Sequence, residues 1–221
     1  MSLHPADIRP AYLHDDNVAY LTWFAGQFSS VFVALAPFVR SIDHASSLQG
    51  TTFVRWSEIA LACRFPSLAH VNRALRMTGS KRVLPALANI EDTRTLLEYG
   101  SKNAILAPVE GSISLPFQIE IAQSLLRSGT ENVSAAGHFG IDPQPMPAAR
   151  FSGPDLVNSA DILACVGSFY TAIYTDYHYM LVCQTDMSRK AIDPSTIFEG
   201  FFATPKTTDF WGIGDLSDAP T

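Results

Sequence analysis

Apolar side chains recur at steps of three and four along much of the chain, and this spacing is typical of amphipathic helices. The longest uncharged stretch covers residues 18–39, or 22 residues. Its apolar stripe consists of Leu21, Phe24, Phe28, Phe32, Leu35 and Val39. We therefore predict a buried central helix here, kinked or ended at Pro37. At about 1.5 Å per residue the same stretch is long enough to cross a bilayer, so a membrane span is the alternative. Polar residues in its middle argue against that alternative.

Two further helices are predicted from their end signals. The first begins after Asn89, an N-cap residue, and is expected to stop at Gly100. The second has Pro116 in its first turn and Arg127 in its last, with Gly129 beyond.

Residues 155–187 also show apolar positions at helical spacing, and a long core helix is predicted there. Threonine and tyrosine are dense over residues 169–179, so a strand is the alternative in that part. Glycine and proline are frequent in residues 129–154, which are expected to form a loop-rich excursion.

Together these elements predict a mainly α fold with few short strands. The expected organisation is a single helical domain over residues 15–190 with extended arms at 1–14 and 191–221, and two helical halves are the alternative for the domain.

Composition changes this picture in one respect. Charged residues make up 16% of the chain, whereas soluble domains average about 25%. A surface with so little charge favours burial of the chain in a homo-oligomer or a larger assembly. The start of the chain carries no basic region followed by an apolar core, so no secretory signal is expected, and an intracellular location is predicted.

Motifs for catalysis, metals and cofactors are missing from the sequence. The three cysteines, Cys63, Cys165 and Cys183, are widely spaced and form no zinc or disulfide pattern. No nucleotide-binding glycine pattern, nucleophile elbow or metalloprotease motif occurs. His138 and His178 are read as structural residues. We therefore predict no enzyme, no metal and no cofactor.

Positive charge is concentrated in one strip of an otherwise acidic chain. Residues 55–82 contain six basic residues against Glu58 alone, a local charge of +5, whereas the whole chain has a charge of −6. The strip consists of Arg55, Arg64, Arg73, Arg76, Lys81 and Arg82. Clustered cations of this kind are typical of phosphate contacts, so we predict non-specific binding of nucleic acid, with RNA favoured over DNA. A solvated helix face is the alternative.

Within this strip, residues 57–76 read as two helices joined by a tight corner. The first helix contains Ile59 and Ala60, and the corner contains Phe65 and Ser67. The second helix contains Arg73, Ala74 and Arg76. The segment resembles the helix-turn-helix of the arabinose-regulator family of bacterial transcription activators.

The resemblance implies that the second helix enters the major groove of DNA. It places Ala69, His70 and Arg73 near the base edges and Arg76 at the DNA backbone. Two positions depart from the family pattern, because Arg64 stands where the corner glycine is expected and Pro66 where a serine is expected.

Aromatic residues mark the C-terminal part of the chain, where no helical or strand period is visible. The predicted assembly arm contains Phe198, Phe201, Phe202, Phe210 and Trp211. Because such side chains avoid water, we expect this arm to lie in a groove of a neighbouring subunit. These observations together favour a self-assembling structural protein, such as a viral coat or nucleocapsid subunit in a host cytoplasm or a virion, that packages nucleic acid. The alternative is a helix-turn-helix regulator.

Overall fold

The computed structural model describes residues 18–40, 52–78, 88–111, 115–127, 129, 131–136, 144–151, 164–166, 171–175 and 177–213. The predicted N-terminal arm at 1–14 lies outside these residues, as do Lys81 and Arg82 of the basic strip. Within the described residues, strands and helices both contribute extensively. The fold is therefore mixed α/β, and the prediction of a mainly α fold is wrong.

The chain divides into two compact units, each built from two separate segments. Unit 1 comprises Met1–Ala36 and Val109–Thr208, and unit 2 comprises Pro37–Pro108 and Asp209–Thr221. The chain thus passes between the units three times. Prolines stand at two of these passages, Pro37 and Pro108.

The uncharged stretch 18–39 holds a short helix and two strands instead of one long helix. They are α1 (Tyr20–Trp23), β1 (Ser30–Leu35) and β2 (Phe38–Arg40). All six residues of β1 are buried. A strand covered on both faces has no polar alternation, so its apolar run resembles that of a buried helix. The helix prediction failed for this reason.

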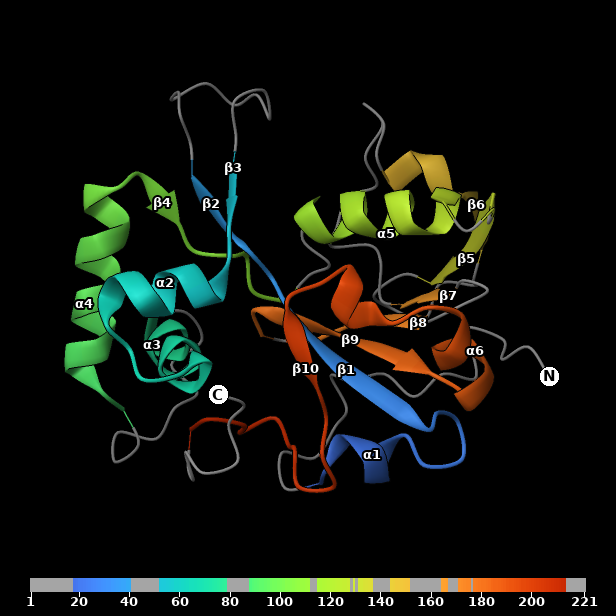
Figure 1. Ribbon diagram of the computed structural model, residues 1–221, viewed down its shortest axis with the longest axis horizontal. Coiled ribbons are helices and arrows are strands. Elements are labelled where there is room, and N and C mark those ends of the chain that lie inside the picture. The colour runs from blue at the N-terminus through green and yellow to red at the C-terminus, as the bar shows by residue number, and fades with distance from the viewer. Residues whose placement is uncertain are drawn as a thin grey trace. The chain divides into compact units, whose positions relative to one another are not determined.

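The main sheet of unit 1 has seven antiparallel strands in the order β10-β1-β9-β8-β7-β5-β6 (Figure 1). Its other members are β5 (Asn132–Ala136), β6 (Gln144–Pro147), β7 (Ala164–Val166), β8 (Thr171–Tyr174), β9 (Tyr179–Gln184) and β10 (Gly200–Phe202). The predicted helix over 155–187 is thus wrong, and the strand alternative at 169–179 describes β8 and the start of β9. Part of the expected loop excursion at 129–154 forms β5, β6 and the 3-10 helix η4 (Ala148–Phe151).

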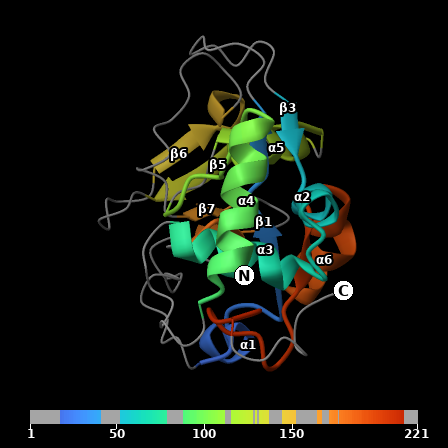
Figure 2. The ribbon, with the colours of Figure 1, turned by 90° about the vertical axis from the view of Figure 1, so that its left-hand side faces the viewer.

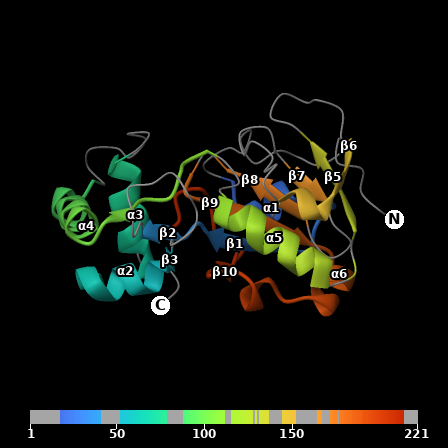
Figure 3. The ribbon, with the colours of Figure 1, turned by 90° about the horizontal axis from the view of Figure 1, so that it is seen from above.

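Helix α5 (Leu115–Arg127), predicted from its end signals, lies across one face of this sheet (Figure 3). Its buried residues Phe117, Ile121 and Leu125 belong to the same apolar core as Phe32 of β1 and Val182 of β9. Such a one-sided apolar helix stabilises a sheet by covering its face.

The opposite face of the sheet meets α1, where the Tyr20 and Tyr179 hydroxyls form a hydrogen bond of 3.0 Å. Tyr179 and Met180 are consecutive on β9, so their side chains point to opposite faces. Both central strands are therefore covered on each side.

In its described residues, unit 2 combines a three-stranded antiparallel sheet, in the order β3-β2-β4 (Figure 1), with three helices that are labelled α2, α3 and α4 in Figure 2. The strands other than β2 are β3 (Thr52–Val54) and β4 (Ile105–Leu106), and the helices are α2 (Trp56–Cys63), α3 (Leu68–Thr78) and α4 (Ile90–Lys102). The predicted start of α4 is confirmed, because the Asn89 side chain accepts hydrogen bonds from the first-turn backbone N–H groups. The predicted stop at Gly100 is wrong, because the helix continues for two more residues to Lys102 and is capped by Asn103.

The aromatic residues of the predicted assembly arm pack within their own chain. Phe198 contacts Phe117 at a ring distance of 5.8 Å, and Phe202 contacts Phe32 at 5.1 Å. Strand β10 itself pairs with β1, so Phe201 lies opposite Val33. Residues 191–213 are thus folded, and they follow α6 (Asp186–Ala191) through the 3-10 helix η6 (Pro194–Thr196).

Only glycine fits at the start of β10. A Cβ atom on Gly200 would lie 1.9 Å from the Val33 carbonyl oxygen. The backbone of the strand therefore approaches β1 as closely as the pairing demands.

The C-terminal segment Asp209–Ile213 completes the core of unit 2 by packing on α3. The Asn72 amide donates a hydrogen bond of 2.8 Å to the Trp211 carbonyl oxygen. The Arg76 guanidinium, fully buried, donates to the Asp209 carbonyl oxygen and lies over the Phe210 ring. A cation without solvent must keep such partners, so Arg76 holds the C-terminal segment in place.

Trp211 carries the apolar part of this contact. It is buried, and its ring lies 6.3 Å from the ring of Trp56 on α2. The next residue, Gly212, has a positive φ of 71°. A Cβ atom at this position would lie 2.6 Å from the Cβ atom of Ala69, so only glycine leaves room for Ala69. The C-terminal segment therefore bridges α2 and α3.

We predict that Trp211→Ala destabilises unit 2 selectively. Removing a buried tryptophan costs about 3–5 kcal/mol, which corresponds to at least a 100-fold rise in local opening. Burial raises the pKa of the Cys63 thiol in unit 2 and of the Cys183 thiol in unit 1, so both react slowly while folded. Thiol labelling followed by mass spectrometry of peptides should show faster modification of Cys63 with little change at Cys183.

The control is Trp23→Ala in unit 1, which should leave the labelling rate of Cys63 unchanged. An unchanged Cys63 rate in Trp211→Ala would contradict the assignment of the C-terminal segment to the core of unit 2.

Candidate functional site

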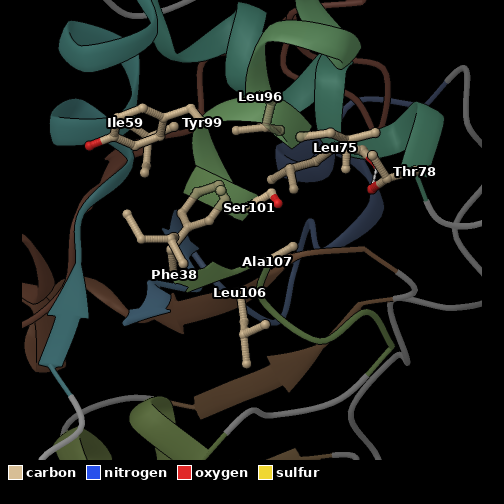
Figure 4. Close-up of a pocket in the computed structure, with 12 residues that line it drawn as sticks. Phe38, Ile59, Leu75, Thr78, Leu96, Tyr99, Ser101, Leu106 and Ala107 are labelled. Carbon is tan, nitrogen blue, oxygen red and sulfur yellow. Dashed lines mark hydrogen bonds between the residues drawn. The ribbon is translucent and has the colours of Figure 1, made fainter. Parts of the chain in front are cut away.

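A pocket of about 320 Å³ opens in unit 2 between its sheet and its helices (Figure 4). Five elements or their adjoining turns line it. The lining residues are Phe38, Ile59, Leu75, Thr78, Leu96, Leu97, Tyr99, Gly100, Ser101, Ile105, Leu106 and Ala107. The whole site thus belongs to one unit of the chain.

The sheet and the helices face each other across the pocket. Figure 4 shows Phe38 and Leu106 on the sheet side, and Leu75 and Leu96 on the helix side. Phe38 is held from behind by Trp56 of α2, with a ring distance of 6.2 Å. The wall therefore rests on buried side chains that are fixed by packing.

The turn between α4 and β4 shapes one end of the pocket. Asn103 caps the helix, since its backbone and side-chain N–H groups both donate to the Tyr99 carbonyl oxygen. Ala104 then takes a positive φ of 52° and directs the chain into β4. A Cβ atom on Gly100 would lie 3.0 Å from the Ile105 carbonyl oxygen, so glycine lets the two segments approach each other. This close approach sets β4 beside the end of α4.

The polar groups of the wall are largely satisfied within the protein. The Thr78 hydroxyl donates to the Leu75 carbonyl oxygen at 2.7 Å, and the Tyr99 and Gly100 carbonyl oxygens accept from Asn103. A wall of this kind favours apolar groups inside the pocket.

Two large apolar side chains stand exposed at the rim. Leu97 is 55% exposed and Leu106 is 62% exposed. Single exposed leucines need no explanation, but here both line the same opening. The apolar surface of the pocket therefore continues to its mouth.

The four described residues of the basic strip are not gathered on one surface. Arg55 and Arg64 are exposed. Arg73 pairs with Asp92 of α4 at 2.8 Å, with both side chains mostly buried, and Arg76 is fully buried. The last two guanidinium groups thus connect α3 to other parts of unit 2.

The predicted helix-turn-helix shape is present, because α2 and α3 are joined by a corner at residues 64–67. Ala69 and Arg76, expected to face DNA, are buried in unit 2. The His70 ring stacks on the Phe65 ring, and its Nδ1 atom forms a hydrogen bond with the Ser67 hydroxyl. Burial, and then the charge of Arg73, lowers the pKa of His70. Helix α3 therefore serves as a core helix of unit 2.

One histidine in unit 1 has an acidic neighbour. The His178 Nε2 atom lies 3.9 Å from Glu110 Oε1, and the His178 backbone accepts a hydrogen bond from Ala36 N–H. Only 5% of the His178 side chain is exposed. This burial agrees with the structural role expected for it, while His138 lies outside the described residues.

The described residues contain no group of three or more metal-binding side chains. None of the helices among them is long and apolar enough to span a membrane.

The sequence pattern does not indicate that the pocket residues lie together. Each is a single apolar or small residue in a different element, and no spacing rule links Phe38 to Leu75 or Ile105. The available signal was indirect, namely the predicted helix stop at Gly100, because residues at the end of α4 line the pocket.

Comparison with known proteins gives one match. A family model described as "Protein of unknown function (DUF2711)" matches residues 16–213. The match spans segments of both units. No curated protein and no solved structure matches the chain.

The corner of the helix pair yields a stability prediction. Arg64 takes the left-handed conformation, φ 58° and ψ 34°, in which a non-glycine residue costs about 1–3 kcal/mol. Arg64→Gly should relieve this strain, and after the added entropy of an unfolded glycine we expect a gain of about 0.5–1 kcal/mol. Urea unfolding followed by circular dichroism measures the change.

The matched variant is Ala62→Gly, an exposed position inside α2, which should lose about 0.5–1 kcal/mol. If both glycine variants are destabilised alike, the left-handed corner is not strained.

Proposed function

The chain belongs to the DUF2711 family, and we propose that it is a binding protein that holds a small apolar ligand in the pocket of unit 2. The observation that carries this proposal is the pocket itself, with an apolar wall and a rim of exposed leucines. Ligand sites in proteins are concave and mostly apolar, and they are usually formed before the ligand arrives.

The size of the pocket limits the ligand. Its volume of about 320 Å³ lies at the lower end of the range for ligand sites, roughly 300–1,000 Å³. A water molecule occupies about 30 Å³, so the space corresponds to about ten non-hydrogen atoms. A single short alkyl chain or one small aromatic ring system fits this limit.

The expected affinity is modest. A ligand of about ten atoms at about 0.3–0.5 kcal/mol per atom gains about 3–5 kcal/mol. This corresponds to a Kd on the order of a millimolar. Saturation-transfer NMR detects binding in this range and identifies which ligand protons contact the protein.

Ala107→Phe should abolish the binding of octanol. Ala107 lines the pocket outside any helix or strand and is exposed, so a larger side chain can enter the opening with little strain on the fold. Octanol should give a saturation-transfer signal with the unchanged protein and lose it with the variant.

Ala62→Phe places the same side chain on the exposed surface of α2, away from the pocket, and should keep the signal. Equal signals from all three proteins would rule out this pocket as the binding site.

Packaging of nucleic acid by a self-assembling coat subunit stays a prediction, as does its alternative, a helix-turn-helix regulator. Arg55 and Arg64 support contact with phosphates, since both are exposed. Arg73 and Arg76 give less support, because each has a partner inside unit 2. The aromatic residues of the predicted assembly arm have partners in their own chain. We therefore favour the binding of a small ligand.

A further inference from the structure

Two basic residues on elements that line the pocket, Arg40 of β2 and Lys102 of α4, are exposed. Neither forms an ion pair with another residue in the part of the chain that the structure describes. Each belongs to an element that also supplies a lining residue, so the position of each follows from the geometry of that element.

Arg40 lies on the pocket side of the sheet of unit 2. It stands two residues after Phe38 on β2, and side chains two apart on a strand share a face. It is also the cross-strand partner of Ile105, and directly opposed residues point to the same side. Since Phe38 and Ile105 both line the pocket, Arg40 is placed at its edge.

Lys102 is the last residue of α4 and directly follows Ser101, which lines the pocket. Its side chain is exposed. A lysine in the last turn is favoured by the partial negative charge of the helix end. The helix therefore keeps a cation close to the mouth.

Helix ends oppose this positive charge. Residues from the last turns of α3 and α4 line the pocket, and each helix C-terminus carries about half a negative elementary charge. The two ends together amount to roughly one negative charge, against two positive charges from Arg40 and Lys102. Among the residues that the structure describes, the balance of these charges is thus about one positive charge.

The nearest carboxylate on α4 does not reverse this balance. Glu98 lies one turn before Lys102 and pairs with Arg94 at 3.3 Å. Arg94 also pairs with Glu91, and all three side chains are exposed to solvent. Their charges are screened by water and partly cancel one another.

We propose that the ligand of this pocket is an amphipathic anion, with an apolar tail in the pocket and a carboxylate at Arg40 and Lys102. This inference rests on the proposed binding of an apolar ligand. A guanidinium fork matches a carboxylate with two parallel hydrogen bonds, and the lysine adds a second charge. Space for about ten atoms fits one short chain, which excludes the paired long chains of a membrane lipid.

The test compares three ligands that share one alkyl chain and differ in charge, namely octanoate, octanol and octylammonium. Their Kd values are measured with the full chain by NMR titration at low salt. Octanoate should bind about three- to tenfold more tightly than octanol, as expected for two solvent-exposed charge contacts, and octylammonium should bind most weakly. Added salt should reduce the preference for octanoate.

Arg40→Gln should bring the affinity for octanoate close to the affinity for octanol measured with the same variant, because the guanidinium contact with the carboxylate is lost. The matched control is Arg64→Gln, an exposed arginine elsewhere in unit 2, which should preserve the preference. The labelling rate of Cys63 verifies that unit 2 is folded in both variants.

Each result separates this inference from the proposed function. If octanol binds and octanoate binds no better, or octylammonium binds best, the anionic ligand is excluded while the apolar pocket stands. If octanoate keeps its preference in Arg40→Gln, the carboxylate lies elsewhere and the inference fails. If none of the three binds, both the pocket's function and its ligand class are refuted.

Discussion

Burial of helix α3 is the constraint on which unit 2 depends. Its buried Arg76 guanidinium donates to the Asp209 carbonyl oxygen, and its Asn72 amide donates to Trp211. Its Arg73 reaches Asp92 on α4. These contacts leave the last turn of α3, with Leu75, as a fixed wall of the pocket. A segment more than a hundred residues away in sequence is therefore required to shape the site.

The local end signals of helices were sufficient to predict α4 and α5. Asn89 accepts its expected hydrogen bonds, and residues 115–127 form the expected helix. The sheet could not be predicted in the same way, because β1 and β9 are buried on both faces and carry no alternation. Their pairing joins residues such as Phe32 and Val182, which are far apart in sequence. Local patterns contain no information about such contacts.

The candidate site could not be predicted from local patterns either. Arginines at positions 73 and 76 have the spacing of a basic surface, yet the fold uses both as internal partners. Sequence alone does not distinguish an arginine that meets a phosphate from one that meets a carbonyl oxygen or Asp92. The pocket, by contrast, is formed by unremarkable apolar residues whose proximity arises only from tertiary packing. Arg40 is assigned to the pocket because β2 pairs with β4 in a register that sets it opposite Ile105, and no sequence motif predicts this pairing.

The proposed function requires an apolar ligand to enter unit 2 between its sheet and its helices. Intermolecular nuclear Overhauser effects between octanoate and methyl-labelled protein test this placement directly. We expect contacts from the ligand's terminal methyl group to the methyl groups of Leu75, Leu96 and Ile105, which line the pocket from three elements. Contacts confined to methyl groups of unit 1, such as those of Leu181, would contradict it.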